Sequence, residues 1–410
     1  MPEKLSIILA HNYYSERGGE DVVFERETEL LRSRGHRLAA FTCSNRAPAP
    51  WKQLAVAAAG AGLYNLKAAH QFRQLLERFR PDLVHVHNTF PLLSPSILSV
   101  CRRMEVPVVA TLHNYRLLCP AATLYRKGQI CQACRRSSCR WQSVARGCYR
   151  NSRVLSAAAC LIMNVHDRLR MWQRSVSLFV VPSNFTRDQF LAAGWPSRQI
   201  CTKPHFVLQD PGPGLGQGRF CLFVGRLAPE KGVRTLLRAW KETRCPWSLK
   251  IAGDGPLANE VASAAHGHPR IQWLGARTSL QVMDLLARAE VLIVPSQCLE
   301  TFGLVVIEAF ARAVPVIASG VGALSELVQD GETGIVVPPG DSSALSAALE
   351  TLAQGQNRDA MGRRARMEFE RRYSAEQNYE LLQEVYRRAL RAPSAGEDLE
   401  PCVVAGLKGI

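Results

Sequence analysis

At 410 residues the chain is more than twice the length of a typical domain of about 150 residues, so the sequence predicts two domains. Hydrophobic residues make up 47% and charged residues 21% of the chain, which excludes wholesale disorder, a collagen-like fold and a small disulfide-stapled scaffold. Residues 1–205 carry 29 Lys and Arg against 12 Asp and Glu, a net charge of +17, whereas residues 206–410 carry 22 against 23, a net charge of −1, so the positive charge of the chain lies in its first half. This half is expected to face an anionic partner, such as nucleic acid, a lipid surface or a phosphorylated acceptor.

Short apolar runs alternate with helical patterns along the first half. We expect strands at residues 5–10, 37–42, 83–86, 106–112 and 178–182, and helices at residues 22–35 and 68–79. Such an alternation predicts an α/β fold in which helices cover both faces of a parallel sheet.

The alternation restarts after a Gly- and Pro-rich stretch at residues 203–218, which we interpret as a linker. Further strands are expected at residues 220–224, 248–252, 271–274, 291–295, 314–318 and 334–337. The sequence thus predicts two Rossmann-like, doubly wound domains facing a cleft, residues 1–205 and 206–374. A helix at 375–391 and a flexible tail at 392–410 follow. Ligands of such domains bind at the carboxyl ends of the strands.

Cysteine usage and hydropathy indicate the compartment. The chain has thirteen cysteines, but it is long and its start lacks a convincing secretory cleavage site, so we expect reduced thiols. No stretch approaches the roughly 20 apolar residues of a membrane span. The expected location is the cytoplasm, with peripheral association on the inner face of the cytoplasmic membrane as an option.

The segment FVGRLAPEKG, Phe223–Gly232, combines a strand end, a loop and a helix start. Its two cations, Arg226 and Lys231, together with free backbone amides suit a diphosphate, because fixed charges and the helix dipole add. Read alone, the segment also fits a solvated basic loop.

A second segment, Cys298–Ser319, places Glu300 in a loop and Glu308 just over one turn into a helix. Carboxylates at these positions can contact two parts of an elongated ligand, and they hold sugars and ribose by accepting hydrogen bonds from hydroxyls. Without its surroundings the pair also fits two solvated side chains.

Together with IAGDGPL and DGETGIVVPPGD, these segments strongly resemble the retaining nucleotide-sugar glycosyltransferases of family four, which have the GT-B fold. In the first half, GGED, VHVHNTFPLLSP and TLHNYRLLCP are similar to the polysaccharide-biosynthesis branch of that family. The resemblance covers residues 4–390. It implies a hexosyltransferase-type enzyme in which residues 1–205 bind the acceptor and residues 206–374 bind the nucleotide sugar.

The resemblance also implies roles for individual residues. Arg226 and Lys231 would hold the donor diphosphate and Glu308 the ribose, while Glu300 and His113 are the implied catalytic residues that contact the transferred sugar. Taken alone, His113 would be interpreted as a structural histidine at a strand end. The full implied donor set is Gly18, Gly19, Gly225, Arg226, Lys231, Phe302, Gly303, Leu304 and Glu308.

The implied chemistry is same-face attack, in which the leaving phosphate oxygen takes the acceptor proton. No protein nucleophile and no catalytic metal are expected. A UDP-sugar is favoured over a GDP-sugar, and the implied acceptor is a polysaccharide, or a saccharide linked to polyprenyl diphosphate.

A cysteine-rich insert at residues 119–150 follows the last of these motifs. Cys131 and Cys134 have the two-residue spacing of a tetrahedral zinc site, which Cys119 and Cys148 would complete, with Cys139 as an alternative ligand. Zinc is favoured over an iron–sulfur cluster. Packed thiols or a labile disulfide are the other interpretations.

The same region is basic, since residues 126–153 contain eight Lys and Arg and no Asp or Glu. With Trp141 and Tyr149 nearby, this stretch is typical of a surface that binds anionic lipid headgroups or the diphosphate of a polyprenyl acceptor.

Two further functions remain open at this point. The zinc-knuckle-like insert and the basic half also fit a nucleic-acid-binding protein, although nothing in residues 206–410 supports that reading. A nucleotide-sugar epimerase on the same fold differs in isomerising its donor without any acceptor.

Overall fold

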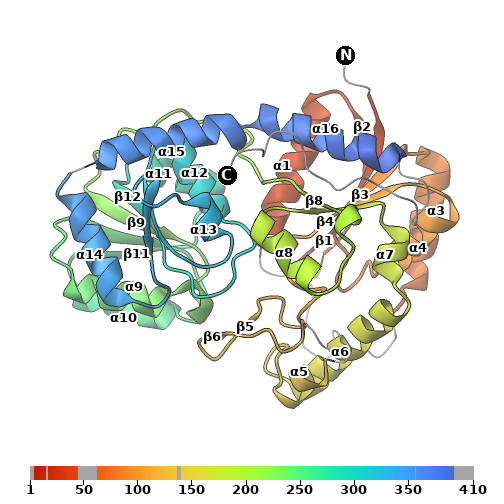
Figure 1. Ribbon diagram of the computed structural model, residues 1–410, viewed down its shortest axis with the longest axis horizontal. Coiled ribbons are helices and arrows are strands. Elements are labelled where there is room, and N and C mark those ends of the chain that lie inside the picture. The colour runs from red at the N-terminus through yellow and green to blue at the C-terminus, as the bar shows by residue number, and fades with distance from the viewer. Residues whose placement is uncertain (1–3, 15–16, 45–61, 136–139, 356, 392–410) are drawn as a thin grey trace. The chain divides into compact units, whose positions relative to one another are not determined.

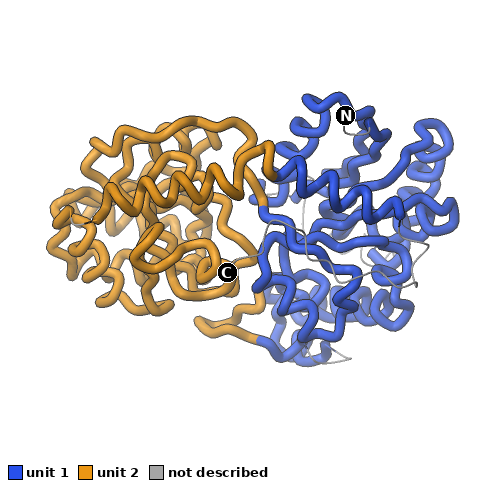
Figure 2. The backbone as a smooth tube through the Cα atoms, turned by 45° about the horizontal axis from the view of Figure 1, so that its top comes forward, with its two compact units in different colours: residues 1–122, 132–204, 378–410 blue, residues 123–131, 205–377 orange. Residues whose placement is uncertain are grey.

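The computed structural model describes residues 4–14, 17–44, 62–135, 140–355 and 357–391, and the chain divides into two compact units (Figures 1 and 2). Unit 1 comprises residues 1–122, 132–204 and 378–410, and unit 2 comprises residues 123–131 and 205–377. Each unit contains a six-stranded, all-parallel sheet. The predicted α/β fold with two Rossmann-like domains is confirmed.

The sheet of unit 1 has the strand order β2-β1-β3-β4-β7-β8. Its strands are β1 Ser6–Tyr13, β2 Arg37–Ser44, β3 Leu83–Asn88, β4 Val108–Thr111, β7 Leu178–Val181 and β8 Ile200–Thr202. The helices are α1 Gly19–Ser33, α3 Leu66–Phe79, α4 Ser96–Arg103, α5 Trp141–Ala145, α6 Arg153–Arg168, α7 Met171–Ser175, α8 Asn184–Ala192 and α16 Ala375–Arg391. The sequence did not predict β8, which has only three residues.

The sheet of unit 2 has the strand order β11-β10-β9-β12-β13-β14. Its strands are β9 Phe220–Val224, β10 Ser248–Ala252, β11 Ile271–Gly275, β12 Val291–Val294, β13 Val316–Ser319 and β14 Gly334–Val337. The helices are η2 Pro229–Lys231, α9 Val233–Glu242, α10 Ala258–Gly267, α11 Ser279–Leu286, α12 Leu304–Ala311, α13 Leu324–Leu327, α14 Ser342–Ala353 and α15 Arg358–Arg372.

Two hydrophobic clusters cover the two faces of this second sheet. Cys221 and Phe223 of β9 point into one cluster, whereas Phe220 and Leu222 point into the other, as the two-residue period of a strand requires. Because the strand order reverses between β9 and β12, the carboxyl ends of these strands form a topological switch point, where doubly wound folds bind ligands.

The units differ from the predicted domain boundaries in two places. A hairpin, β5 Tyr125–Arg126 and β6 Gln129–Ile130, groups with unit 2, although the insert 119–150 was expected to lie wholly in the first domain. The Tyr125 hydroxyl donates a hydrogen bond of 3.0 Å to Gln297 Oε1, a contact that no local pattern in the sequence predicts.

The second difference concerns α16, which was expected to be a separate element. From residue 378 onward it groups with unit 1, where it buries Leu382, Val385 and Tyr386. The predicted tail, residues 392–410, lies outside the described residues. None of the described helices is both long and apolar enough to span a bilayer.

Candidate active site

The loop after β9 brings the predicted cations to the switch point of unit 2. Gly225 ends the strand region and donates its N–H to Ala252, Arg226 is exposed, and Lys231 ends η2. Gly232 follows at φ +71°, and a Cβ there would lie 1.8 Å from the Pro295 carbonyl oxygen. Only glycine therefore lets this loop approach the end of β12 so closely.

Lys231 and Glu300 form an ion pair at this point. Lys231 Nζ lies 2.6 Å from Glu300 Oε1, and the Ser296 hydroxyl donates to the same oxygen at 2.6 Å. Burial opposes the charged form of Lys231, but the Glu300 carboxylate beside it raises the pKa of Lys231 above its ordinary value. Within the described residues Glu300 Oε2 makes no hydrogen bond, so one carboxylate oxygen is available to a ligand hydroxyl.

Close contacts also fix the backbone of Glu300. Ala323 donates its N–H to the Glu300 carbonyl at 2.9 Å, and a Cβ on Gly322, which has φ +64°, would lie 2.5 Å from the Glu300 nitrogen. The carboxylate is therefore positioned by backbone contacts as well as by its ion pair.

The start of α12 contributes the remaining predicted donor residues. Phe302 is buried, Gly303 caps the helix without a side-chain hydrogen bond, and Leu304 is its first residue. The Val306 N–H already donates to the Gly303 carbonyl at 2.9 Å, and among the described residues no side chain caps the two amides before it, which can bind an anion or ligand oxygens. Glu308 is buried one turn further along.

In unit 1 the predicted glycines lie at the start of α1, beyond the end of β1. Gly18 is the N-cap and Gly19 the first helical residue, and a Cβ on Gly18 would meet no atom within 4 Å. Asp21 Oδ2 accepts the Gly18 N–H at 3.0 Å, and its Oδ1 lies 2.7 Å from His11 Nε2. Asp21 thus fixes Gly18 at the start of α1, and among the described residues no atom lies within 4 Å of a Cβ at Gly18.

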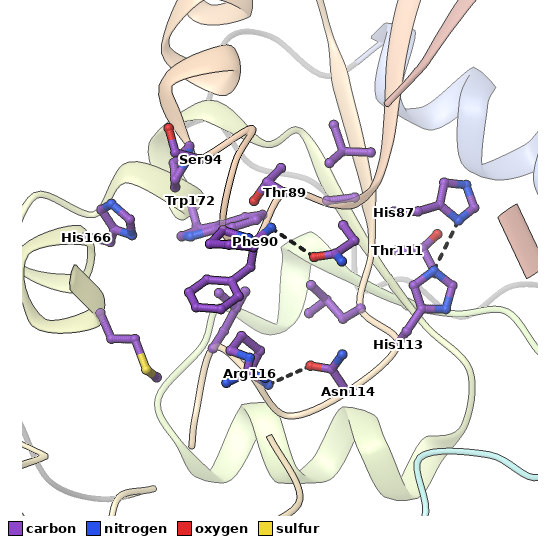
Figure 3. Close-up of a pocket in the computed structure, with 18 of the residues that line it drawn as sticks. His87, Thr89, Phe90, Ser94, Thr111, His113, Asn114, Arg116, His166 and Trp172 are labelled. Atoms are coloured by element: carbon purple, nitrogen blue, oxygen red, sulfur yellow. Dashed lines mark hydrogen bonds between the residues drawn. The ribbon is translucent and has the colours of Figure 1, made fainter. Parts of the chain in front are cut away.

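His113 follows β4 in the same unit. Its Nε2 lies 3.1 Å from His87 Nδ1, and the two rings are stacked with centroids 5.2 Å apart (Figure 3). Burial lowers the pKa of both histidines well below the ordinary range, with neighbouring histidines adding to the effect. Both rings are therefore neutral at physiological pH.

Behind this pair lies a buried network that sequence reasoning missed. Lys203 Nζ and Glu27 Oε1 form an ion pair of 2.6 Å, and Glu27 Oε2 lies 3.4 Å from His87 Nε2 and 3.7 Å from His85 Nδ1. Glu27, His85 and His87 are, among the described residues, the one group spaced closely enough to ligate a metal. The ammonium of Lys203 already compensates the carboxylate, so the network fits a structural ion pair better than a cation site.

The cysteine insert does not form the predicted zinc cluster in the part of the chain that the structure describes. Cys119, Cys131, Cys134 and Cys148 are all thiols, but no three of their sulfurs lie within 4.8 Å of one another. The alternative ligand, Cys139, lies outside the described residues. The residues as placed do not fit a four-cysteine zinc site, which stays a prediction from spacing.

The structure thus brings Lys231 and Glu300 into direct contact and places the α12 residues at the same sheet edge of unit 2. Gly18, Gly19 and His113 belong to unit 1. Sequence reasoning missed the residues that support Glu300, namely Ser296, Gly322 and Ala323. It also missed Gln297, which donates to Thr235 and accepts from Tyr125.

Sequence models of two families match the chain. One is described as glycosyl transferase 4-like domain and matches residues 18–205, and the other as glycosyl transferases group 1 and matches residues 218–355.

Two relatives and one solved structure illustrate the similarity. Glycogen synthase of Mycobacterium tuberculosis is 29% identical over 288 residues, which are 67% of this chain and 60% of that enzyme. D-rhamnosyltransferase WbpZ of Pseudomonas aeruginosa is 27% identical over 318 residues, 76% of this chain and 74% of that protein. Anabaena Alr3699/HepE, crystallised with UDP and glucose, superposes with a TM-score of 0.65 at 17% identity and covers 93% of this chain and 99% of its own.

The matched segment thus spans less than two thirds of the length of the mycobacterial enzyme. The two family models nevertheless cover most of both units, and the solved structure shares the fold of two parallel-sheet units. The chain therefore belongs to the GT-B glycosyltransferases of the family-four type.

Proposed function

We propose that this protein is a retaining glycosyltransferase that moves a sugar from a nucleotide sugar to a saccharide acceptor. The observation that carries the proposal is the Lys231–Glu300 ion pair at the switch point of unit 2, with Arg226 on the adjoining loop. It combines cations for a diphosphate with a carboxylate for sugar hydroxyls in one place.

The chemistry follows from these groups. Breaking the bond from the anomeric carbon to the diphosphate places growing negative charge on the leaving group, which Arg226, Lys231 and the first amides of α12 stabilise. Glu300 holds the transferred sugar through its second oxygen, and Glu308 holds the ribose. The acceptor oxygen attacks the face that the leaving group vacates, and the departing phosphate oxygen takes its proton.

His113 acts in its neutral form. Its Nε2 is engaged with His87, so the ring is held in one orientation and offers polar contact to the donor sugar without adding a charge. In this proposal Glu300 positions the sugar rather than attacking it, unlike the nucleophile of a retaining glycosidase.

A UDP-sugar is the donor that we favour, since Alr3699/HepE was crystallised with UDP and glucose. The test is thermal unfolding with UDP, GDP and ADP and then with their sugar conjugates. A ligand at 100 times its dissociation constant adds about 2.7 kcal/mol of stability. Stabilisation by one nucleotide, and more by one conjugate, identifies the donor, whereas no shift with any of them contradicts the proposal. The anomeric configuration of the product, read by NMR, tests retention.

The acceptor proposed here is a polysaccharide precursor or a polyprenyl-diphosphate-linked saccharide, used at the cytoplasmic face of an anionic membrane. Exposed apolar side chains gather on α5 and α6, where Trp141 is 61%, Val154 65% and Leu161 58% exposed. Exposed arginines accompany them at positions 146, 150 and 153. Aromatic, aliphatic and basic side chains together suit the surface of an anionic bilayer.

Sedimentation with anionic vesicles tests whether α5 and α6 bind an anionic membrane. Binding should weaken as salt rises, and it should fall in Leu161→Ser but not in Leu66→Ser, an equally apolar, exposed site on α3. Salt-insensitive behaviour, or equal loss in both variants, would contradict it.

A further inference from the structure

The β5–β6 hairpin belongs to unit 2, although the segments on both sides of it in the sequence belong to unit 1. The chain leaves unit 1 after Ala122, forms the hairpin and returns to unit 1 at Gln132. Residues 123–131 therefore have the colour of unit 2 in Figure 2, between two stretches in the colour of unit 1. The proposed function gives this short excursion of the chain no role.

The hairpin has a defined backbone. Lys127 and Gly128 form its two-residue turn, with φ of +48° and +82°. Positive φ at both turn positions is the geometry that matches the twist of two antiparallel strands. At the base of the hairpin the Cys131 N–H donates to the Leu124 carbonyl at 2.7 Å, and the Leu124 side chain is buried. The hairpin therefore presents Tyr125, the first residue of β5, from a fixed position.

Tyr125 forms a hydrogen bond that fixes a side chain of unit 2. Its hydroxyl donates to Gln297 Oε1 at 3.0 Å, and Gln297 Nε2 donates to the Thr235 hydroxyl on α9 at 2.8 Å. Both ends of the Gln297 amide are thus engaged, so the side chain is held in one orientation. Burial, with Cys298 and Glu230 adding to it, raises the pKa of Tyr125 above its usual value, so the hydroxyl keeps the proton that it donates.

Gln297 lies at the centre of the loop that holds Glu300. Its N–H donates to the Glu230 carbonyl at 2.8 Å, which ties this loop to η2. The Ser296 hydroxyl, one residue before Gln297, donates to Glu300 Oε1 at 2.6 Å. The Cys298 carbonyl, one residue after it, accepts the Glu300 N–H at 2.9 Å. The carboxylate and the backbone of Glu300 are therefore both held by the immediate neighbours of Gln297.

We propose that Tyr125 is a positioning residue of this site, which through Gln297 holds residues 296–300 in the geometry that binds the transferred sugar. A group that binds a ligand precisely needs neighbours that fix its own position, and the hairpin supplies one of them from the first half of the sequence. The assignment rests on the proposed function, in which Glu300 binds the transferred sugar. It adds to that function a residue that acts through Gln297 rather than on the donor itself.

Hydrogen exchange of the full-length protein without any ligand tests the hold on the loop. Tyr125→Phe removes the hydroxyl and keeps the ring, so its effect is confined to the hydrogen bond with Gln297. Exchange of the amides at residues 297–300, followed by mass spectrometry, should become about fivefold faster, because the loss of one hydrogen bond lets the loop open more often. Unchanged exchange at these amides would overturn the proposal.

The matched control is Tyr64→Phe in unit 1. The Tyr64 hydroxyl also has a side-chain partner, since it accepts a hydrogen bond from Arg103 at 2.9 Å. This variant should leave exchange at residues 297–300 as it is in the wild type. An equal acceleration in both tyrosine variants would show a general loosening of the protein and would overturn the proposal.

A double variant tests whether Tyr125 acts through Gln297. Gln297→Leu removes the acceptor, so adding Tyr125→Phe to it should change exchange at residues 297–300 by less than twofold. A further fivefold acceleration in the double variant would overturn the route through Gln297. Thermal unfolding of each variant shows that it is folded under the conditions of the exchange experiment.

Calorimetric titration with UDP and UDP-glucose tests the consequence for the sugar. Because Glu300 binds the transferred sugar in the proposed function, Tyr125→Phe should change the affinity for UDP by less than twofold. The ratio of the UDP-glucose affinity to the UDP affinity should fall at least about threefold. A merely structural role would lower stability and leave this ratio unchanged, so an unchanged ratio would overturn the positioning role.

The two kinds of measurement separate this inference from the proposed function. Nucleotide-sugar binding, together with exchange that does not respond to Tyr125→Phe, rejects the positioning role and leaves the transferase proposal standing. Faster exchange in Tyr125→Phe, without any nucleotide-sugar binding by the wild type, supports the hold of Tyr125 on the loop and rejects the transferase.

Discussion

Unit 2 builds its candidate site from charged side chains at a sheet edge, whereas unit 1 surrounds its site with buried groups that are mainly uncharged. Lys231 and Glu300 are partly exposed and charged, and glycine backbone holds them in place. In unit 1, His87 and His113 are neutral, and the charges of Glu27 and Lys203 compensate each other below the surface. The first arrangement offers fixed charges to an anionic ligand, while the second offers neutral hydrogen-bonding groups.

Breaking the buried Glu27–Lys203 ion pair of unit 1 should have the largest effect on stability. Glu27→Gln leaves the Lys203 ammonium buried without a counter-charge, which should lower the free energy of unfolding by about 3–5 kcal/mol. Combining it with Lys203→Met should recover most of that loss. Urea titration measures both, and a single-variant loss below about 1 kcal/mol would show that the pair is not buried as described.

In unit 2 the corresponding test disturbs the backbone that holds Glu300. Gly322→Ala places a Cβ against the Glu300 nitrogen at a positive φ, so unfolding free energy should fall by roughly 3 kcal/mol. Gly331→Ala has a similar φ of +75° but open space around the Cβ, and should cost about 1 kcal/mol. Equal losses of unfolding free energy in the two variants would mean that the close approach of Gly322 to Glu300 does not affect stability.

Removing a charge from unit 2 should affect catalysis rather than folding. Lys231→Met should lower kcat at least about 100-fold, which corresponds to about 2.7 kcal/mol of transition-state stabilisation. Lys241→Met, at an exposed position on α9, is the control. Steady-state kinetics with the identified donor decide the matter, and a change below threefold in kcat would exclude Lys231 from the reaction.

Acid should destabilise unit 1 through its neutral histidines. Burial lowers the pKa of His85 to about 4, so below pH 6.5 the unfolded chain binds a proton that the folded unit does not. Stability is therefore lost as pH falls from 6.5 towards 4, by about 2 kcal/mol at pH 5 for this histidine alone. Urea titrations at pH 7 and pH 5 measure the loss, and equal stability at both would show that His85 is already protonated or exposed.

The smallest effect concerns the cysteine insert. The Cys131–Cys134 spacing predicts about one zinc per chain, which Cys131→Ser should lower and Cys43→Ser, outside the insert, should not. Metal analysis of gently purified protein measures this. Metal-free protein would contradict the zinc prediction.

Local pattern predicted the strands other than β8 and the β5–β6 hairpin, the switch-point loops and the separate roles of Lys231 and Glu300. Their contact joins residues 69 positions apart, and the family resemblance, not the spacing, implied that they share a site. The Glu27–Lys203 pair spans 176 positions and the Tyr125–Gln297 bond 172, and neither leaves a periodic signal in the sequence. Cys131 and Cys134 show that a local pattern can be present without the predicted site. Their spacing suits zinc, but it cannot by itself bring Cys119 and Cys148 to the same point.

The position of α16 has a consequence for biosynthesis. Unit 1 is complete only when this helix arrives, because Tyr379 contacts His36, Tyr386 contacts His85, and Asn378 accepts a hydrogen bond from Lys203. A ribosome makes the chain from its amino end, so all of unit 2 has been synthesised before these partners appear. Unit 1, whose first strands are translated first, is thus the last unit to finish folding, and its buried histidines lack their partners on α16 until all of unit 2 has been made.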